Sequence, residues 1–282
     1  MTQTPVSHYI TCQGLEVHVT EWGKGNAEKM IMWHGLARTG RDFDPLAQIL
    51  AERYHIIAPD TIGRGLSQWA AQPDTQYCLD FYGKIASDLC AHFGFKTYKW
   101  IGTSMGAALG IRLAATTMRD NMTHLVLNDM GPKIEPSAIE RILTYAGNPP
   151  VYQTVSEMEQ GLRTIYKPYG YLTDEQWRLM TETSVRRNPD GTVTMHYDPK
   201  MVRQFIVHPN DYDQWDYFNS IECQILLIRG AETDLLSTET RDAMLANNRN
   251  CDLYEVEGVG HAPAMNVAEQ IERIRSFLDR SK

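Results

Sequence analysis

A serine between two glycines marks the place where this chain could carry a nucleophile. Gly102-Thr103-Ser104-Met105-Gly106 follows a short apolar run at 98–101 and opens a small, apolar stretch with helical periodicity. A sharp strand-to-helix turn exposes a serine hydroxyl group, and side chains at the glycine positions would clash there. Ser104 is therefore the candidate nucleophile. The N–H of Met105 would lie at a helix N-terminus, where negative charge is favoured.

A second loop could complete a site for a negatively charged oxygen. Trp33-His34-Gly35-Leu36 follows the apolar run at 30–33, and the N–H of Leu36 could face that of Met105. Two donors aimed at one point form an oxyanion hole, and each is worth about 10²–10³ in kcat. We expect His34 to hold this loop rather than to transfer protons.

A candidate base and a candidate acid follow two later apolar runs. His261 comes after the run at 253–256, and Asp234 comes after the run at 225–228. Side chains at the carboxyl ends of parallel strands meet at one edge of an open sheet. A histidine that is oriented by an acid can activate a serine for attack on a carbonyl group, so these residue types predict nucleophilic catalysis.

The elements that would position these residues alternate along the chain. Residues 9–22 alternate in polarity around Gln13-Gly14, which predicts an opening β-hairpin. The apolar runs lie at 30–33, 55–58, 98–101, 125–127, 225–228 and 253–256, and stretches with helical periodicity lie at 44–51, 79–93, 104–118 and 271–278. This order predicts an α/β fold with a mostly parallel, doubly wound sheet that helices cover on both faces.

The strand–helix alternation stops between residues 132 and 220. This stretch has a helical pattern and holds 12 of the 27 aromatic residues, among them Tyr145 and Tyr166. We interpret it as a helical cap (lid) inserted into a core domain formed by residues 1–131 and 221–282. The aromatic side chains could build the core of a small insert, line an apolar substrate pocket, or do both.

Composition and charge exclude several classes of protein. The 282 residues are 43% hydrophobic and 22% charged, as in an ordinary globular protein. The net charge of −8 and the absence of a Lys/Arg cluster argue against a nucleic acid or an anionic membrane as partner. Five scattered cysteines without a C-x-x-C motif, and no signal-peptide pattern, predict a cytoplasmic protein. The sequence leaves open whether it is a monomer or a homodimer.

On these residues the chain resembles the α/β-hydrolase-fold superfamily, and within it the esterase/lipase-like group with a helical cap. The matching segments are the His34-Gly35 loop, residues 60–67, 102–106, 230–234 and Gly260-His261. The resemblance covers essentially the whole chain and implies a structural role for residues 60–67. It places the acid at Asp234, the usual position. Some members take the acid from the position of Asp129, which is therefore the alternative.

The resemblance implies a serine hydrolase that acts on carboxylic esters, including lactones, thioesters or polyester oligomers. Ser104 would attack the carbonyl carbon, His261 would take its proton, and Asp234 would orient the imidazole. The N–H groups of Leu36 and Met105 would stabilise the oxyanion before water resolves the acyl-enzyme. The expected substrate is a small, mostly apolar ester. Neither a metal nor an organic cofactor is expected, and the sequence has no Walker A or H-E-x-x-H motif.

Other functions stay open on the same residues. Hydrolysis of a carbon–carbon bond in a ring-cleavage dienoate is the first, although such relatives often have a second glycine where this chain has Ala107. A pocket with several cationic groups would favour it. Cofactor-free haloperoxidase or perhydrolase activity and a small-molecule receptor are further alternatives. Ser104 argues against haloalkane dehalogenases and epoxide hydrolases, whose nucleophile is an aspartate.

Overall fold

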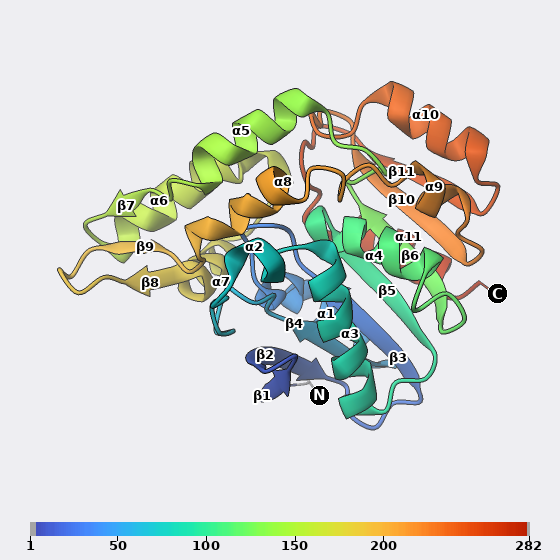
Figure 1. Cartoon of the computed structure of the whole chain (residues 1–282), viewed down its shortest axis with the longest axis horizontal. Coiled ribbons are helices and arrows are strands. Elements are labelled where there is room, and N and C mark those ends of the chain that lie inside the picture. Colours follow the sequence, from blue (N-terminus) through green and yellow to red (C-terminus); the bar gives the residue numbers. More distant parts are fainter. Residues whose placement is uncertain (1–3, 281–282) are drawn as a thin grey trace.

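An eight-stranded sheet forms the centre of the computed structural model, which describes residues 4–280 (Figure 1). The strands are β1 (Val6–Cys12), β2 (Leu15–Trp22), β3 (Glu28–Trp33), β4 (Tyr54–Pro59), β5 (Tyr98–Thr103), β6 (Met122–Asn128), β10 (Gln224–Gly230) and β11 (Cys251–Val256). Their order in the sheet is β1-β2-β4-β3-β5-β6-β10-β11. The strands from β4 to β11 in this order are parallel, whereas β1 and β2 form an antiparallel hairpin at one edge.

The turn of this hairpin follows from its two central residues. Gln13 and Gly14 have φ angles of 50° and 78°. Positive φ at both positions matches the right-handed twist of the flanking strands, and glycine adopts it without a steric cost. The predicted opening hairpin is therefore confirmed.

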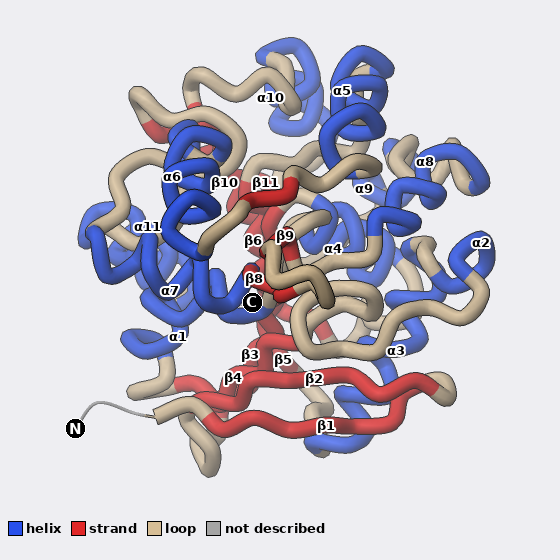
Figure 2. Tube along the Cα trace, turned by 90° about the vertical axis from the view of Figure 1, so that its left-hand side faces the viewer, coloured by secondary structure: helices blue, strands red, loops and turns tan. Residues whose placement is uncertain are grey.

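Helices cover both faces of the sheet, as Figure 2 shows with the sheet seen near its edge. α1 (Asp44–Leu50) and α11 (Ala268–Leu278) pack on one face, and α3 (Leu79–Phe93) and α4 (Met105–Ala115) pack on the other. Successive residues of a strand point to opposite faces. Met30 and Met32 accordingly pack with α1 and α11, while Ile31 and Trp33 pack with α3 and α4. The predicted α/β fold class is confirmed.

Between β6 and β10 the chain leaves the central sheet and forms a second group of elements (Figure 1). Its helices are α5 (Pro136–Ala146), α6 (Val155–Ile165), α7 (Asp174–Ser184) and α8 (Arg203–Val207), whereas α9 (Trp215–Asn219), just before β10, packs against α4. A three-stranded antiparallel sheet accompanies them, formed by β7 (Val151–Tyr152), β9 (Val193–Met195) and β8 (Val185–Arg187). The sequence pattern predicted helices here but not this small sheet. The division into core and cap stays a prediction.

Two further helices were also missed in the sequence. α10 (Thr238–Asn247) connects β10 to β11, and the single turn α2 (Pro73–Gln76) precedes α3. Ser237 caps α10 by accepting a hydrogen bond from the N–H of Thr240, which is a local signal for a helix start. Across residues 4–280, every helix is too short or too polar to span a lipid bilayer.

Candidate active site

The turn between β5 and α4 holds Ser104 in a backbone conformation that few residues other than glycine adopt. Its φ and ψ angles are 52° and −116°. A Cβ atom at Gly102 would collide with the carbonyl oxygen of Gly106, and one at Gly106 would collide with that of Trp33. Both glycines are therefore needed for the turn to approach the neighbouring backbone so closely. A strained serine held by its surroundings in this way indicates a functional site.

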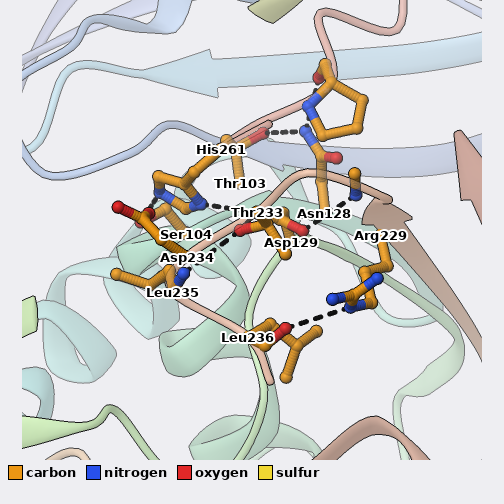
Figure 3. Close-up of polar contacts among 12 residues, drawn as sticks. Thr103, Ser104, Asn128, Asp129, Arg229, Thr233, Asp234, Leu235, Leu236 and His261 are labelled. Carbon is orange, nitrogen blue, oxygen red and sulfur yellow. Dashed lines mark hydrogen bonds and ion pairs between the residues drawn. The ribbon is translucent and has the colours of Figure 1, made fainter. Parts of the chain in front are cut away.

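His261 contacts Ser104 through one ring nitrogen and Asp129 through the other (Figure 3). Its Nε2 lies 3.0 Å from Ser104 Oγ, and its Nδ1 lies 2.7 Å from Asp129 Oδ2. An ionised carboxylate only accepts hydrogen bonds, so Nδ1–H donates to Asp129. Nε2 is then the acceptor for the Ser104 hydroxyl, which is the tautomer that a general base requires.

Asp129 is fully buried directly after β6, and both of its carboxylate oxygens accept hydrogen bonds. Oδ1 accepts from the N–H of Gly230 at 3.0 Å, and Oδ2 accepts from Thr233 Oγ1 at 2.6 Å as well as from His261. A buried carboxylate needs such donors in place of lost water. The φ angle of 55° at Asp129 is one that Asp tolerates better than most residues.

The structure does not place Asp234 against His261, so the prediction of Asp234 as its partner is wrong in this geometry. The Asp234 side chain is 58% exposed, and both of its oxygens accept from the guanidinium of Arg141 on α5. The loop after β10 instead contributes Thr233, which donates to Asp129. The carboxylate that contacts His261 therefore comes from the strand end that was named as the alternative, and Asp234 lines the cavity instead.

His34 holds the loop after β3, as predicted. Its Nε2 accepts from the N–H of Thr61 at 2.8 Å, and its Nδ1 donates to the carbonyl of Gly35 at 2.6 Å. Burial lowers the pKa of the His34 imidazole to about 4, so the ring is neutral at pH 7. Arg64 fixes the next part of this loop by donating to the carbonyl oxygen of Leu36 at 2.8 Å.

Ser104 and His261 face a cavity of about 430 Å³. Leu36 lines the same cavity, whereas Met105, the first residue of α4, is buried and does not line it. Aromatic residues from the segment between β6 and β10 form part of the wall, namely Tyr145, Tyr166 and Tyr169. The cavity also carries four charged side chains: Arg38 and Arg141, which the sequence pattern did not single out, together with Glu232 and Asp234. The wall is thus more polar than the expected apolar pocket.

Within residues 4–280, no three His, Cys, Asp or Glu side chains come together as a metal site.

The mostly parallel sheet with its serine turn defines an α/β hydrolase, and comparison with known families agrees. The chain belongs to the alpha/beta hydrolase family, whose model matches residues 30–273. The family resemblance inferred from the sequence is confirmed, and the protein is a hydrolase.

Known proteins resemble this chain along nearly its whole length. A 3-hydroxybutyrate-oligomer hydrolase from Cupriavidus necator is 37% identical over 268 residues, which covers 92% of this chain and 91% of the relative. The crystal structure of an alpha/beta hydrolase from Novosphingobium aromaticivorans is 27% identical, with a TM-score of 0.85 over 98% of this chain and 99% of that chain. The structure of E-2-(acetamidomethylene)succinate hydrolase, 21% identical, has a TM-score of 0.85 over 98% of this chain and 100% of that chain, and shows the same fold.

Proposed function

We propose that this protein hydrolyses carboxylic esters, with oligomers of 3-hydroxybutyrate as its substrate, through a catalytic triad of Ser104, His261 and Asp129. One observation carries the proposal. The His261 imidazole is hydrogen-bonded to the Ser104 hydroxyl on one side and to a buried carboxylate on the other. This arrangement both activates the serine and fixes the tautomer of its base.

The proposed mechanism has two stages, formation of an acyl-enzyme and its hydrolysis. Ser104 Oγ attacks the ester carbonyl carbon while His261 Nε2 takes its proton. The carbon–oxygen bond then breaks, and His261 returns the proton to the leaving alcohol. Water, deprotonated by the same nitrogen, attacks the acyl-enzyme and releases the acid with Ser104 restored. Asp129 stabilises the imidazolium that forms in each step.

The N–H groups of Leu36 and Met105 are the proposed donors to the oxyanion. Leu36 lines the cavity beside Ser104, and Met105 opens α4, where the helix dipole favours negative charge. His34 and Arg64 support this role by fixing the loop on either side of Leu36. Preorganised donors of this kind need no rearrangement during the reaction.

Two observations support 3-hydroxybutyrate oligomers as the substrate. The Cupriavidus necator relative, named for that activity, matches this chain over 92% of its length. The cavity of about 430 Å³ lies within the range of roughly 300–1,000 Å³ typical of small-molecule sites. A short linear ester of a small hydroxy acid fits both observations. The segment between β6 and β10 acts as the cap, because it supplies Arg141 and three tyrosines to the cavity wall.

Hydrolysis of a carbon–carbon bond in a dienoate is the second candidate. It is favoured by the two arginines on the cavity wall, Arg38 and Arg141, because cationic groups would bind an acidic substrate. Ala107, at the position where such relatives often have glycine, argues against it.

The test compares the wild type with Ser104→Ala on the 3-hydroxybutyrate dimer and trimer and on p-nitrophenyl acetate through palmitate. Loss of the nucleophile should lower kcat by roughly 10⁶-fold while the melting temperature stays near that of the wild type. Ser276→Ala, on the exposed side of α11, is the control and should keep full activity. Turnover of a dienoate by a folded protein that leaves every ester intact would overturn the proposal.

A further inference from the structure

The two arginines on the cavity wall differ in how firmly they are held. Arg38 has a side chain that is only 3% exposed, and it donates to both oxygens of Asp42 at 2.8 and 2.5 Å and to Ser184 Oγ at 2.8 Å. Its guanidinium also lies 4.8 Å from the centre of the Tyr166 ring. Breaking a buried pair of this kind is strongly destabilising, because it leaves a charge without a partner. Arg38 is therefore committed to its own partners.

Arg141 is held much more loosely. Its side chain on α5 is 48% exposed, and its partner, Asp234, is 58% exposed. An ion pair in contact with water contributes little to stability, so exchanging one carboxylate for another costs little. Tyr145, one helical turn further along α5, lines the same cavity as Arg141. The guanidinium is thus an accessible cation on the wall that Ser104 also faces.

We propose that Arg141 binds the free carboxylate of the substrate in place of Asp234, so that the enzyme selects oligoesters with an ionised acid end over neutral esters. The inference rests on the proposed ester hydrolysis and names Arg141 as the residue that determines which class of ester the enzyme prefers. A linear oligomer of a hydroxy acid has one free carboxylate and ester carbonyls behind it. A guanidinium matches a carboxylate with two parallel hydrogen bonds. Arg141 and Ser104 line the same cavity. A substrate whose free carboxylate is bound by Arg141 would therefore have an ester carbonyl in the cavity that Ser104 faces.

The acidic residues beside Arg141 set the strength of this contact. Asp234 accepts hydrogen bonds from Nη1 and Nη2 of Arg141, the two nitrogens that would donate to the substrate carboxylate. Glu232 lines the same cavity. Asp234 therefore competes with the substrate carboxylate for the guanidinium of Arg141. Removing the arginine and removing its acidic competitor should change acid binding in opposite directions, which a purely structural role for the pair would not produce.

The experiment compares the 3-hydroxybutyrate dimer with its terminal primary amide, a neutral analogue with the same internal ester. For the wild type, kcat/KM should be at least 10-fold higher on the acid, about the effect of one charged hydrogen-bonded contact. Arg141→Gln should lower that ratio about 10-fold, mainly through KM on the acid. Asp234→Asn should raise it. Arg178→Gln, an exposed arginine on α7 away from this cavity, is the matched control and should leave the ratio unchanged.

Equal kcat/KM of the wild type on acid and amide would overturn the inference, and so would an equal fall on both substrates in Arg141→Gln. A folded wild type without turnover on either compound or on p-nitrophenyl esters would instead contradict the proposed function. Calorimetric binding of 3-hydroxybutyrate to the Ser104→Ala protein tests the contact without turnover. Adding Arg141→Gln should weaken this binding about 10-fold, and unchanged binding would overturn the inference.

Discussion

The Nδ1 atom of His261 and a carboxylate oxygen of Asp129 lie 2.7 Å apart, although 132 residues separate them in the chain. Their strands, β11 and β6, are not neighbours in the sheet, because β10 runs between them. Asp129 therefore accepts from Gly230 at the end of β10 and from Thr233 in the loop that follows this strand. The strand between acid and base thus supplies the donors that hold the acid in place.

The first prediction concerns this acid. Asp129→Asn keeps the size of the side chain but replaces a carboxylate that accepts from Nδ1–H with an amide. The imidazole then loses both its favoured tautomer and the charge that stabilises the imidazolium, so kcat should fall by about 10⁴-fold. Steady-state kinetics on the 3-hydroxybutyrate dimer measure the loss, and circular dichroism checks that the variant is folded.

Asp234→Asn is the comparison for this prediction. Asp234 contacts Arg141 and not His261. The kcat of the Asp234→Asn variant should therefore exceed that of the Asp129→Asn variant by more than about 100-fold. The reverse order in two folded proteins would restore Asp234 as the acid and would mean that the loop after β10 rearranges in solution.

The second prediction is that Thr233 positions Asp129. Thr233→Val removes the donor to Asp129 Oδ2 and keeps the shape of the side chain. A hydrogen bond to a charged group is worth about 1.5–3 kcal/mol, so kcat should fall by roughly 10- to 100-fold with little change in KM. Thr233→Ser restores the hydroxyl and should recover most of the rate. If the kcat of Thr233→Ser were no higher than that of Thr233→Val, the hydroxyl group would not position Asp129 and only the packing of the side chain would affect the rate.

The order of strands and helices could be predicted from the sequence because the inner parallel strands β4, β5, β6 and β10 are buried on both faces. The apolar run that ends at Ile228, for example, lies within β10, and every residue from Ile225 to Gly230 is buried. The small sheet β7-β9-β8 could not be predicted in this way. Its strands have two or three residues each, too few for a period of two to be distinguished from chance.

The contact between Ser104 and His261 could be predicted from the sequence, but the carboxylate that contacts His261 could not. Asp129 and Asp234 both follow apolar strands whose carboxyl ends meet at the same edge of the sheet. Which of them reaches His261 depends on the φ angle of 55° at Asp129 and on the hydroxyl of Thr233, and neither has a signature in the sequence. The contribution of Arg141 to the cavity was also missed, because it depends on how α5 packs against the rest of the chain.

The third prediction tests the serine turn. Gly106→Ala would place a Cβ atom against the carbonyl oxygen of Trp33, a rigid part of β3. We expect a loss of at least about 2 kcal/mol in the free energy of unfolding, in the range of other overpacked sites. Gly83→Ala on α3 is the control, since its new Cβ would meet only the end of the Leu113 side chain. Urea denaturation measures both variants, and equal stabilities would contradict the turn geometry.

The fourth prediction follows from the buried imidazole of His34. Burial lowers its pKa from 6.5 to about 4, so the folded protein resists protonation that the unfolded chain accepts. Above pH 6.5 the ring is neutral in both states, and its contribution to stability is constant. As the pH falls from 6.5 toward 4, the unfolded state gains a proton and the free energy of unfolding drops, by about 3 kcal/mol in total.

His34→Gln removes this titration while the amide oxygen can still accept from the N–H of Thr61. Between pH 4.5 and 6, the slope of unfolding free energy against pH should fall by up to about 1.4 kcal/mol per pH unit relative to the wild type. Burial also lowers the pKa of His124 to about 4, but that residue is present in both proteins, so the difference isolates His34. His92→Gln, at an exposed position of α3, is the control and should keep the wild-type slope. An identical slope in His34→Gln would mean that the ring is protonated in the folded protein, and the N–H of Thr61 would then have lost its acceptor.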